Sequence, residues 1–112
     1  MTSWATAAAT AAEYAEQTEA GGAVARPVVD QLIADGAMKL WVPARYGGGE
    51  RHLQVGLDAM AAVGRGCGSS GWAVMIANTT GLLASRLNSD AGELLFGDPA
   101  SICGGFAPPT GV

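Results

Sequence analysis

The chain has 112 residues, 49% of them hydrophobic, and a formal net charge of −4. This length suits one small domain and is short for a complete enzyme that encloses a large cofactor. The six lysines and arginines are not clustered, so the composition excludes a nucleic-acid partner.

Cysteine usage and the apolar runs indicate a cytoplasmic protein that does not enter the membrane. Cys67 and Cys103 lie far apart without a metal-binding or redox spacing, so we expect two reduced thiols, with a single disulfide as the alternative. The N-terminus lacks the basic segment of a secretory signal. Residues 66–85 carry no charge, which would suit a membrane span, but the polar residues among them favour a buried helix.

The first third of the chain predicts two helices. Residues 3–20 are rich in alanine and carry three glutamates, three residues apart, on one side, which is typical of a helix with a solvated acidic face. Pro27 suits the first turn of a second helix, and Gly36 is a natural end for it. In the next segment, Met38, Leu40 and Val42 alternate with Ala37, Lys39 and Trp41. This alternation over residues 37–42 favours a short extended or single-turn segment.

The organising feature of the chain is an irregular loop over residues 40–50. Pro43 cannot lie inside a helix without losing a backbone hydrogen bond, and the glycines at 47–49 allow positive φ angles or a close approach. The glycine run is only weak evidence for a phosphate site, since such runs are usually turns. We therefore expect a specific loop between two helical layers.

Two longer helices are expected after the loop. For the first, the periodicity predicts a core face made by Leu53, Leu57, Met60, Ala61 and Gly64, with His52 at its entrance as a solvated or capping residue. For the second, over residues 71–87, Ser69 or Ser70 is the expected N-cap. Its predicted core face is Trp72, Met75, Ile76, Thr79, Leu83 and Leu87, beside a face of small residues.

The C-terminal part predicts a change of structure. Ser89 or Asp90 is expected to cap a short helix that ends near Phe96. Residues 101–106 suit the first strand of a β domain, and a single strand is not stable alone, so its partner strands are missing. The predicted organisation is an all-α helical domain over residues 1–98, followed over 99–112 by the first strand and loop of an incomplete β domain.

No autonomous active site is visible. The sequence has no nucleophile beside a base, no phosphate-binding loop, no dinucleotide-binding fingerprint and no metal-ligand spacing.

The order of elements resembles the N-terminal helical domain of the acyl-CoA dehydrogenase superfamily of flavoproteins. The family pattern L-x-x-x-G-x-x-x-L-x-V-P-x-x-Y-G-G is matched by Leu32, Gly36, Leu40, Val42, Pro43, Tyr46, Gly47 and Gly48. The resemblance covers nearly the whole chain, since two helices and a glycine-rich segment follow at the expected distances.

Within that superfamily the sequence is most similar to the flavin-dependent monooxygenases, which use reduced flavin from a partner reductase on aromatic or polycyclic substrates. Residues 67–72 and 104–111 look like that branch, and the Thr-Glu-Pro and Gly-Ser-Asp motifs of the dehydrogenases are absent. One departure is that Thr79 and Thr80 stand where those hydroxylases often carry a histidine. FAD-dependent dehydrogenation of acyl thioesters is the alternative chemistry.

The resemblance implies that this chain contains only part of a binding site. Its cofactor, FAD or FMN, would lie against Gly105, Phe106, Ala107, Pro108 and Thr110, while Trp72 and Thr80 would wall the pocket of a small-molecule substrate. Full binding needs further domains, so the resemblance implies a fragment that is inactive alone, from a family of homo-oligomers, commonly tetramers. A non-catalytic helical interaction module is the remaining alternative.

Overall fold

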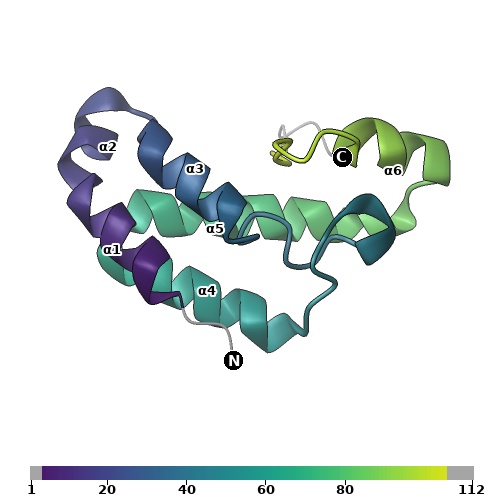
Figure 1. Cartoon of the computed structure of the whole chain (residues 1–112), viewed down its shortest axis with the longest axis horizontal. Coiled ribbons are helices and arrows are strands. Elements are labelled where there is room, and N and C mark those ends of the chain that lie inside the picture. Colours follow the sequence, from purple (N-terminus) through teal and green to yellow (C-terminus); the bar gives the residue numbers. More distant parts are fainter. Residues whose placement is uncertain (1–3, 106–112) are drawn as a thin grey trace, which may run out of the picture.

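The computed structural model describes residues 4–105, and every regular element in that range is a helix (Figure 1). The elements are α1 (Ala5–Glu13), α2 (Ala15–Gly21), α3 (Arg26–Ala34), the 3₁₀ turn η1 (Ala44–Tyr46), α4 (Leu53–Gly66), α5 (Gly68–Leu82), the 3₁₀ turn η2 (Leu83–Arg86) and α6 (Ser89–Phe96). The all-α prediction is confirmed. None of the described helices is long and apolar enough to span a membrane.

The α4–α5 hairpin forms the centre of the fold, and its helices approach closely because glycines face each other. A Cβ atom on Gly71 would lie 2.6 Å from the Cα of Gly64. Helix α1 packs across α4, where Gly66 meets the backbone oxygen of Ala8. Small residues at the helix crossings therefore allow close backbone approach, while larger side chains such as Trp4, Trp41 and Phe96 are buried elsewhere in the core.

The N-terminal helix is interrupted, which the sequence did not predict. The expected helix over residues 3–20 is divided at Tyr14 into α1 and α2, and the Tyr14 side chain packs against the core. Gly22, at φ 68°, ends α2, and the buried Thr18 hydroxyl accepts a hydrogen bond from the Ala25 amide at 3.1 Å. The glutamates of this segment are exposed as predicted.

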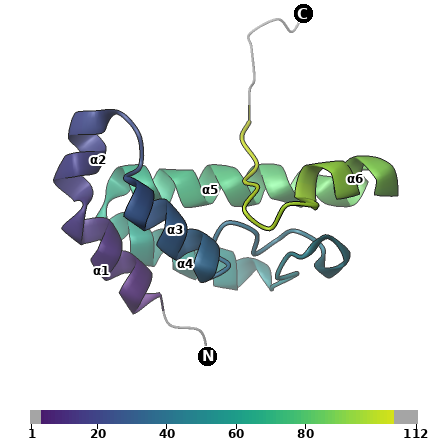
Figure 2. The same cartoon turned by 45° about the horizontal axis from the view of Figure 1, so that its top comes forward.

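Helix α3 and its exit agree with the sequence analysis. Pro27 lies in the first turn of the helix, and Gly36 adopts φ 74° directly after it. Residues 37–42 then follow a series of turns with most side chains buried. In Figure 2 this segment leaves the end of α3 and runs at a level between α5 and α4.

The loop over residues 40–50 folds back on itself. The Gly49 amide donates to the Lys39 carbonyl at 2.8 Å, and the Arg51 amide donates to the Leu40 carbonyl at 2.7 Å. Gly47 has φ 82°, and a Cβ at Gly48 would collide with the backbone oxygen of Val42. Both glycines are therefore required by the shape of the loop.

The predicted core faces of α4 and α5 are mostly wrong, although Met60 does pack against the core. The exposed fraction is 55% for Leu53, 66% for Trp72 and 62% for Leu83. The buried residues are Gly56, Ala59 and Val63 on α4, and Ser70, Gly71, Val74, Ala77, Asn78 and Gly81 on α5. Since both helices carry apolar residues on several sides, periodicity alone did not select the packed face; close backbone approach did.

The helix caps were predicted with mixed success. The expected caps Ser69 or Ser70 are wrong, because α5 begins one turn earlier, after Cys67. Asn88, not Ser89 or Asp90, caps α6 by accepting from the Ala91 amide at 2.9 Å. His52 caps α4 through Nδ1, which accepts from the Gln54 amide at 3.2 Å, so the capping interpretation is confirmed.

The His52 cap gives a first prediction. We expect His52→Ala to lower the free energy of unfolding by about 1 kcal/mol, because the substitution leaves the Gln54 amide without its acceptor. His52→Asn, which restores a short acceptor, should recover most of that loss. Urea denaturation followed by far-UV circular dichroism measures both, and equal stability of the alanine variant and the parent would contradict the capping role.

Candidate functional site

Two residues that the sequence assigned to one site are in contact. A Cβ atom on Gly105 would lie 2.8 Å from the Cγ2 methyl of Thr80, so the backbone at Gly105 lies directly against α5. Gly104, the residue before it, has open space where a side chain would be. The other four predicted cofactor residues, Phe106, Ala107, Pro108 and Thr110, lie outside the described residues.

Thr80 presents its methyl group rather than its hydroxyl hydrogen to this contact. Its Oγ1 donates to the Ile76 carbonyl at 2.6 Å, which fixes the side chain in one rotamer. Thr79 makes the same kind of bond to the Met75 carbonyl, at 2.8 Å. Neither hydroxyl is positioned as an acid or a base, so the site at this point is a wall and not a source of protons.

Trp72 lies on the same helix, eight residues before Thr80, which corresponds to roughly 12 Å along the axis. Its indole is largely exposed. The apolar residues Ile76 and Leu83 lie within about 40° of it around the helix, so α5 presents an apolar strip on the side opposite its buried small residues. Trp72 and Thr80 therefore both lie on α5, but their side chains do not touch each other.

Residues 101–105, the described part of the predicted strand, have no regular secondary structure. Ile102 is partly exposed, and Cys103 packs against the small cluster of Val42, Tyr46, Ala84 and Phe96. Among the described residues no hydrogen bond uses the amides of Gly104 or Gly105. Both glycines are exposed.

Both cysteines are free thiols, as expected. Burial raises the pKa of the Cys103 thiol, and the nearby Lys39 ammonium opposes that shift. The described residues contain no cluster of histidine, cysteine, aspartate or glutamate that could hold a metal ion.

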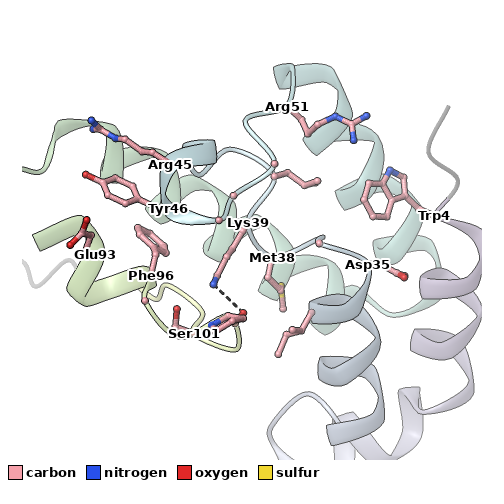
Figure 3. Close-up of a pocket in the computed structure, with 18 residues that line it drawn as sticks. Trp4, Asp35, Met38, Lys39, Arg45, Tyr46, Arg51, Glu93, Phe96 and Ser101 are labelled. Atoms are coloured by element: carbon pink, nitrogen blue, oxygen red, sulfur yellow. Dashed lines mark hydrogen bonds between the residues drawn. The ribbon is translucent and has the colours of Figure 1, made fainter. Parts of the chain in front are cut away.

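A separate cavity of about 630 Å³ lies under the loop of residues 40–50 (Figure 3). Met38, Leu40 and Phe96 form its buried apolar part, and Lys39, Arg45 and Arg51 contribute charge. The sequence analysis did not find this cavity, since its residues come from α3, the loop, α6 and the segment after α6. Of the predicted site residues that the structure describes, namely Trp72, Thr80 and Gly105, none lines it.

Asn78 connects these regions and was also missed. It is fully buried on α5, two residues before Thr80. Its Oδ1 accepts from the Leu40 amide at 2.8 Å, and its Nδ2 donates to the Ala37 carbonyl at 2.7 Å. Asn78 is the one amide side chain in the charge-free run of residues 66–85, and that was the signal that could have identified it.

The described elements form an all-helical domain in which the backbone at Gly105 lies against α5. Residues 3–91 match the family model "Acyl-CoA dehydrogenase, N-terminal domain". The chain belongs to this family, so the resemblance found in the sequence is confirmed at that level. No curated protein and no solved structure gives a significant match.

Membership places the chain among the flavin-dependent oxidoreductases, a family whose members generally bind FAD and are typically oligomeric. The matched residues include α1 to α5 and the loop of residues 40–50. Gly105 and the remainder of the predicted cofactor segment lie beyond the match.

Proposed function

We propose that this domain forms one wall of the active site of a reduced-flavin monooxygenase that hydroxylates an aromatic or polycyclic substrate. The observation that carries the proposal is the contact between Thr80 and Gly105. It brings the start of the glycine-rich segment onto the helix that carries the expected substrate wall. A partner flavin reductase would supply the reduced cofactor.

In this proposal the chain binds, orients and excludes water. Gly105, Phe106, Ala107, Pro108 and Thr110 hold the flavin edge through backbone groups, since glycine and other small residues permit close approach. The bound flavin supplies the redox chemistry and the activation of dioxygen. Thr80 contributes a methyl group and Trp72 an exposed indole, and both exclude water from an apolar substrate.

Dehydrogenation of an acyl thioester is the second candidate, favoured by the description of the matching family. In that chemistry FAD would supply the oxidant for the acyl thioester, and a carboxylate would act as the base. By family resemblance, the base would come from a C-terminal helical domain. The absence of Thr-Glu-Pro and Gly-Ser-Asp motifs between residues 1 and 112 favours the monooxygenase instead.

Flavin titration tests the proposal. The chain is mixed with FMN or FAD, oxidised or chemically reduced under anaerobic conditions, alone and with a supplied C-terminal half, and flavin fluorescence and amide NMR shifts are recorded. We expect saturable binding with shifts at Thr80 and Gly105, tighter for reduced flavin. Tighter binding of oxidised FAD would favour the dehydrogenase, and no binding in either mixture would favour an interaction module.

A matched glycine pair sharpens that test. Gly105→Val should weaken flavin binding by about tenfold or more, because the new side chain would displace the Thr80 methyl and obstruct the backbone amide. Gly104→Val adds the same side chain where there is open space and should change binding far less. Equal effects of the two substitutions would contradict the placement of the cofactor against Gly105.

A further inference from the structure

The cavity under the loop of residues 40–50 is independent of the α5 wall. Its volume of about 630 Å³ falls within the range of small-molecule sites, roughly 300–1,000 Å³. Figure 3 shows Lys39 extending toward the segment that carries Ser101, with Met38 and Phe96 on either side, while the head groups of Arg45 and Arg51 lie at the outer edges. We propose that this cavity binds a small organic carboxylate with an apolar body.

The charge distribution points to an anion. Three of the six basic residues of the chain, Lys39, Arg45 and Arg51, line this one cavity, although the chain as a whole carries a net charge of −4. The two carboxylates in the lining, Asp35 and Glu93, leave a net positive charge. A cavity with this balance attracts a singly charged anion and disfavours a cation.

A polar corner provides specific partners for the carboxylate. Lys39 Nζ donates to the carbonyls of Asp98 and Pro99, at 3.3 and 3.1 Å, which leaves one N–H available. Ser101 Oγ is buried in the same lining and has no hydrogen-bond partner. An unpaired buried hydroxyl is costly, and a carboxylate oxygen would satisfy it.

The glycine run argues against a phosphate. The amides of Gly47, Gly48 and Gly49 all donate to backbone carbonyls of the loop or of Lys39 just before it, at 2.9, 3.2 and 2.8 Å respectively. They therefore form no free set of N–H groups for a phosphoryl oxygen. A doubly charged phosphate would also meet the carboxylates of Asp35 and Glu93.

The remaining surface of the cavity suits an apolar body. Met38 and Leu40 are buried between the loop and α3, and Phe96 contributes a ring that is stacked on Tyr46 at 5.9 Å. Lys39 lies over the Phe96 ring, with Nζ 5.8 Å from the ring centre. A ligand would thus place its charged end at Lys39 and Ser101 and its apolar end against these side chains.

Cinnamate and its uncharged analogue cinnamamide test the proposal on the full chain by two-dimensional amide NMR. We expect cinnamate to give saturable shifts at Lys39, Gly97 and Ser101, and cinnamamide to bind about tenfold more weakly because it lacks the charge. Equal binding of the two compounds, no saturable shift, or shifts centred on the exposed residues 72–83 would overturn the assignment.

Substitutions locate the anion within the cavity. Lys39→Met retains a long side chain over Phe96 without charge and should weaken cinnamate binding by about tenfold, and Ser101→Ala by about threefold. Arg86→Met removes a cation outside the cavity and should leave binding within about twofold of the parent. If the Arg86 variant lost as much affinity as the Lys39 variant, the attraction would be general and the site would be rejected.

Discussion

Replacing Asn78 with leucine is expected to lower the free energy of unfolding by about 3–4 kcal/mol, one of the two largest effects we predict for a single substitution. The side chain is fully buried and satisfies the Leu40 amide and the Ala37 carbonyl. Leucine has a similar volume but no polar atoms, so both backbone groups would stay buried without partners. Urea denaturation followed by far-UV circular dichroism measures the loss.

Thr79→Val is the matched control, one residue further along α5. Thr79 is exposed, and its hydroxyl bonds only to its own helix, so its replacement should change stability by less than about 0.5 kcal/mol. If Asn78→Leu were as mild as this control, the loop would hold its position without Asn78. In that case other contacts, such as the backbone bonds of Gly49 and Arg51, would determine the loop.

Local chemistry made part of this fold predictable. Pro27, Gly36 and His52 act through their own backbone or the adjacent turn, so the sequence identified their roles without knowledge of the tertiary structure. The loop near Pro43 was predicted for the same reason. The family resemblance then supplied the order of the helices, which the match over residues 3–91 confirms.

Packing between helices was not predictable from periodicity. Helix α5 carries apolar residues on all sides, so the large face of Trp72 and Leu83 was chosen as core although it is exposed. Burial instead follows Gly71 and Gly81, whose missing side chains admit neighbouring atoms. A pattern of large apolar residues shows which side of a helix is hydrophobic. Which side packs closely depends on the helix that lies opposite it.

The Thr80–Gly105 contact and the cavity also differ in how far the sequence could predict them. Thr80 and Gly105 were paired through the resemblance, and the structure brings them into contact. The cavity depends on Lys39 meeting the carbonyls of Asp98 and Pro99, about sixty residues away, and no local signal encodes such a contact. Sequence analysis therefore paired two residues that are in contact and missed the cavity.

Gly71→Ala is expected to destabilise the fold by about 2–3 kcal/mol, because a single methyl group would force α4 and α5 apart. The new Cβ would lie 2.6 Å from the Cα of Gly64 and 2.9 Å from its nitrogen. Both are backbone atoms, so no flexible side chain can move aside. The free energy of unfolding, obtained from urea denaturation, measures the cost.

Gly68→Ala is the matched control on the same helix, and its expected effect is the opposite. Nothing lies within 4 Å of a Cβ at Gly68, and alanine has the higher helix propensity, so this variant should be unchanged or more stable by up to about 1 kcal/mol. A difference in sign between the two substitutions would separate packing from propensity. Because Trp72 follows Gly71 directly, displacement of α5 should also move its indole, so the Trp72 indole N–H signal, resolved by NMR from those of Trp4 and Trp41, should shift in folded Gly71→Ala.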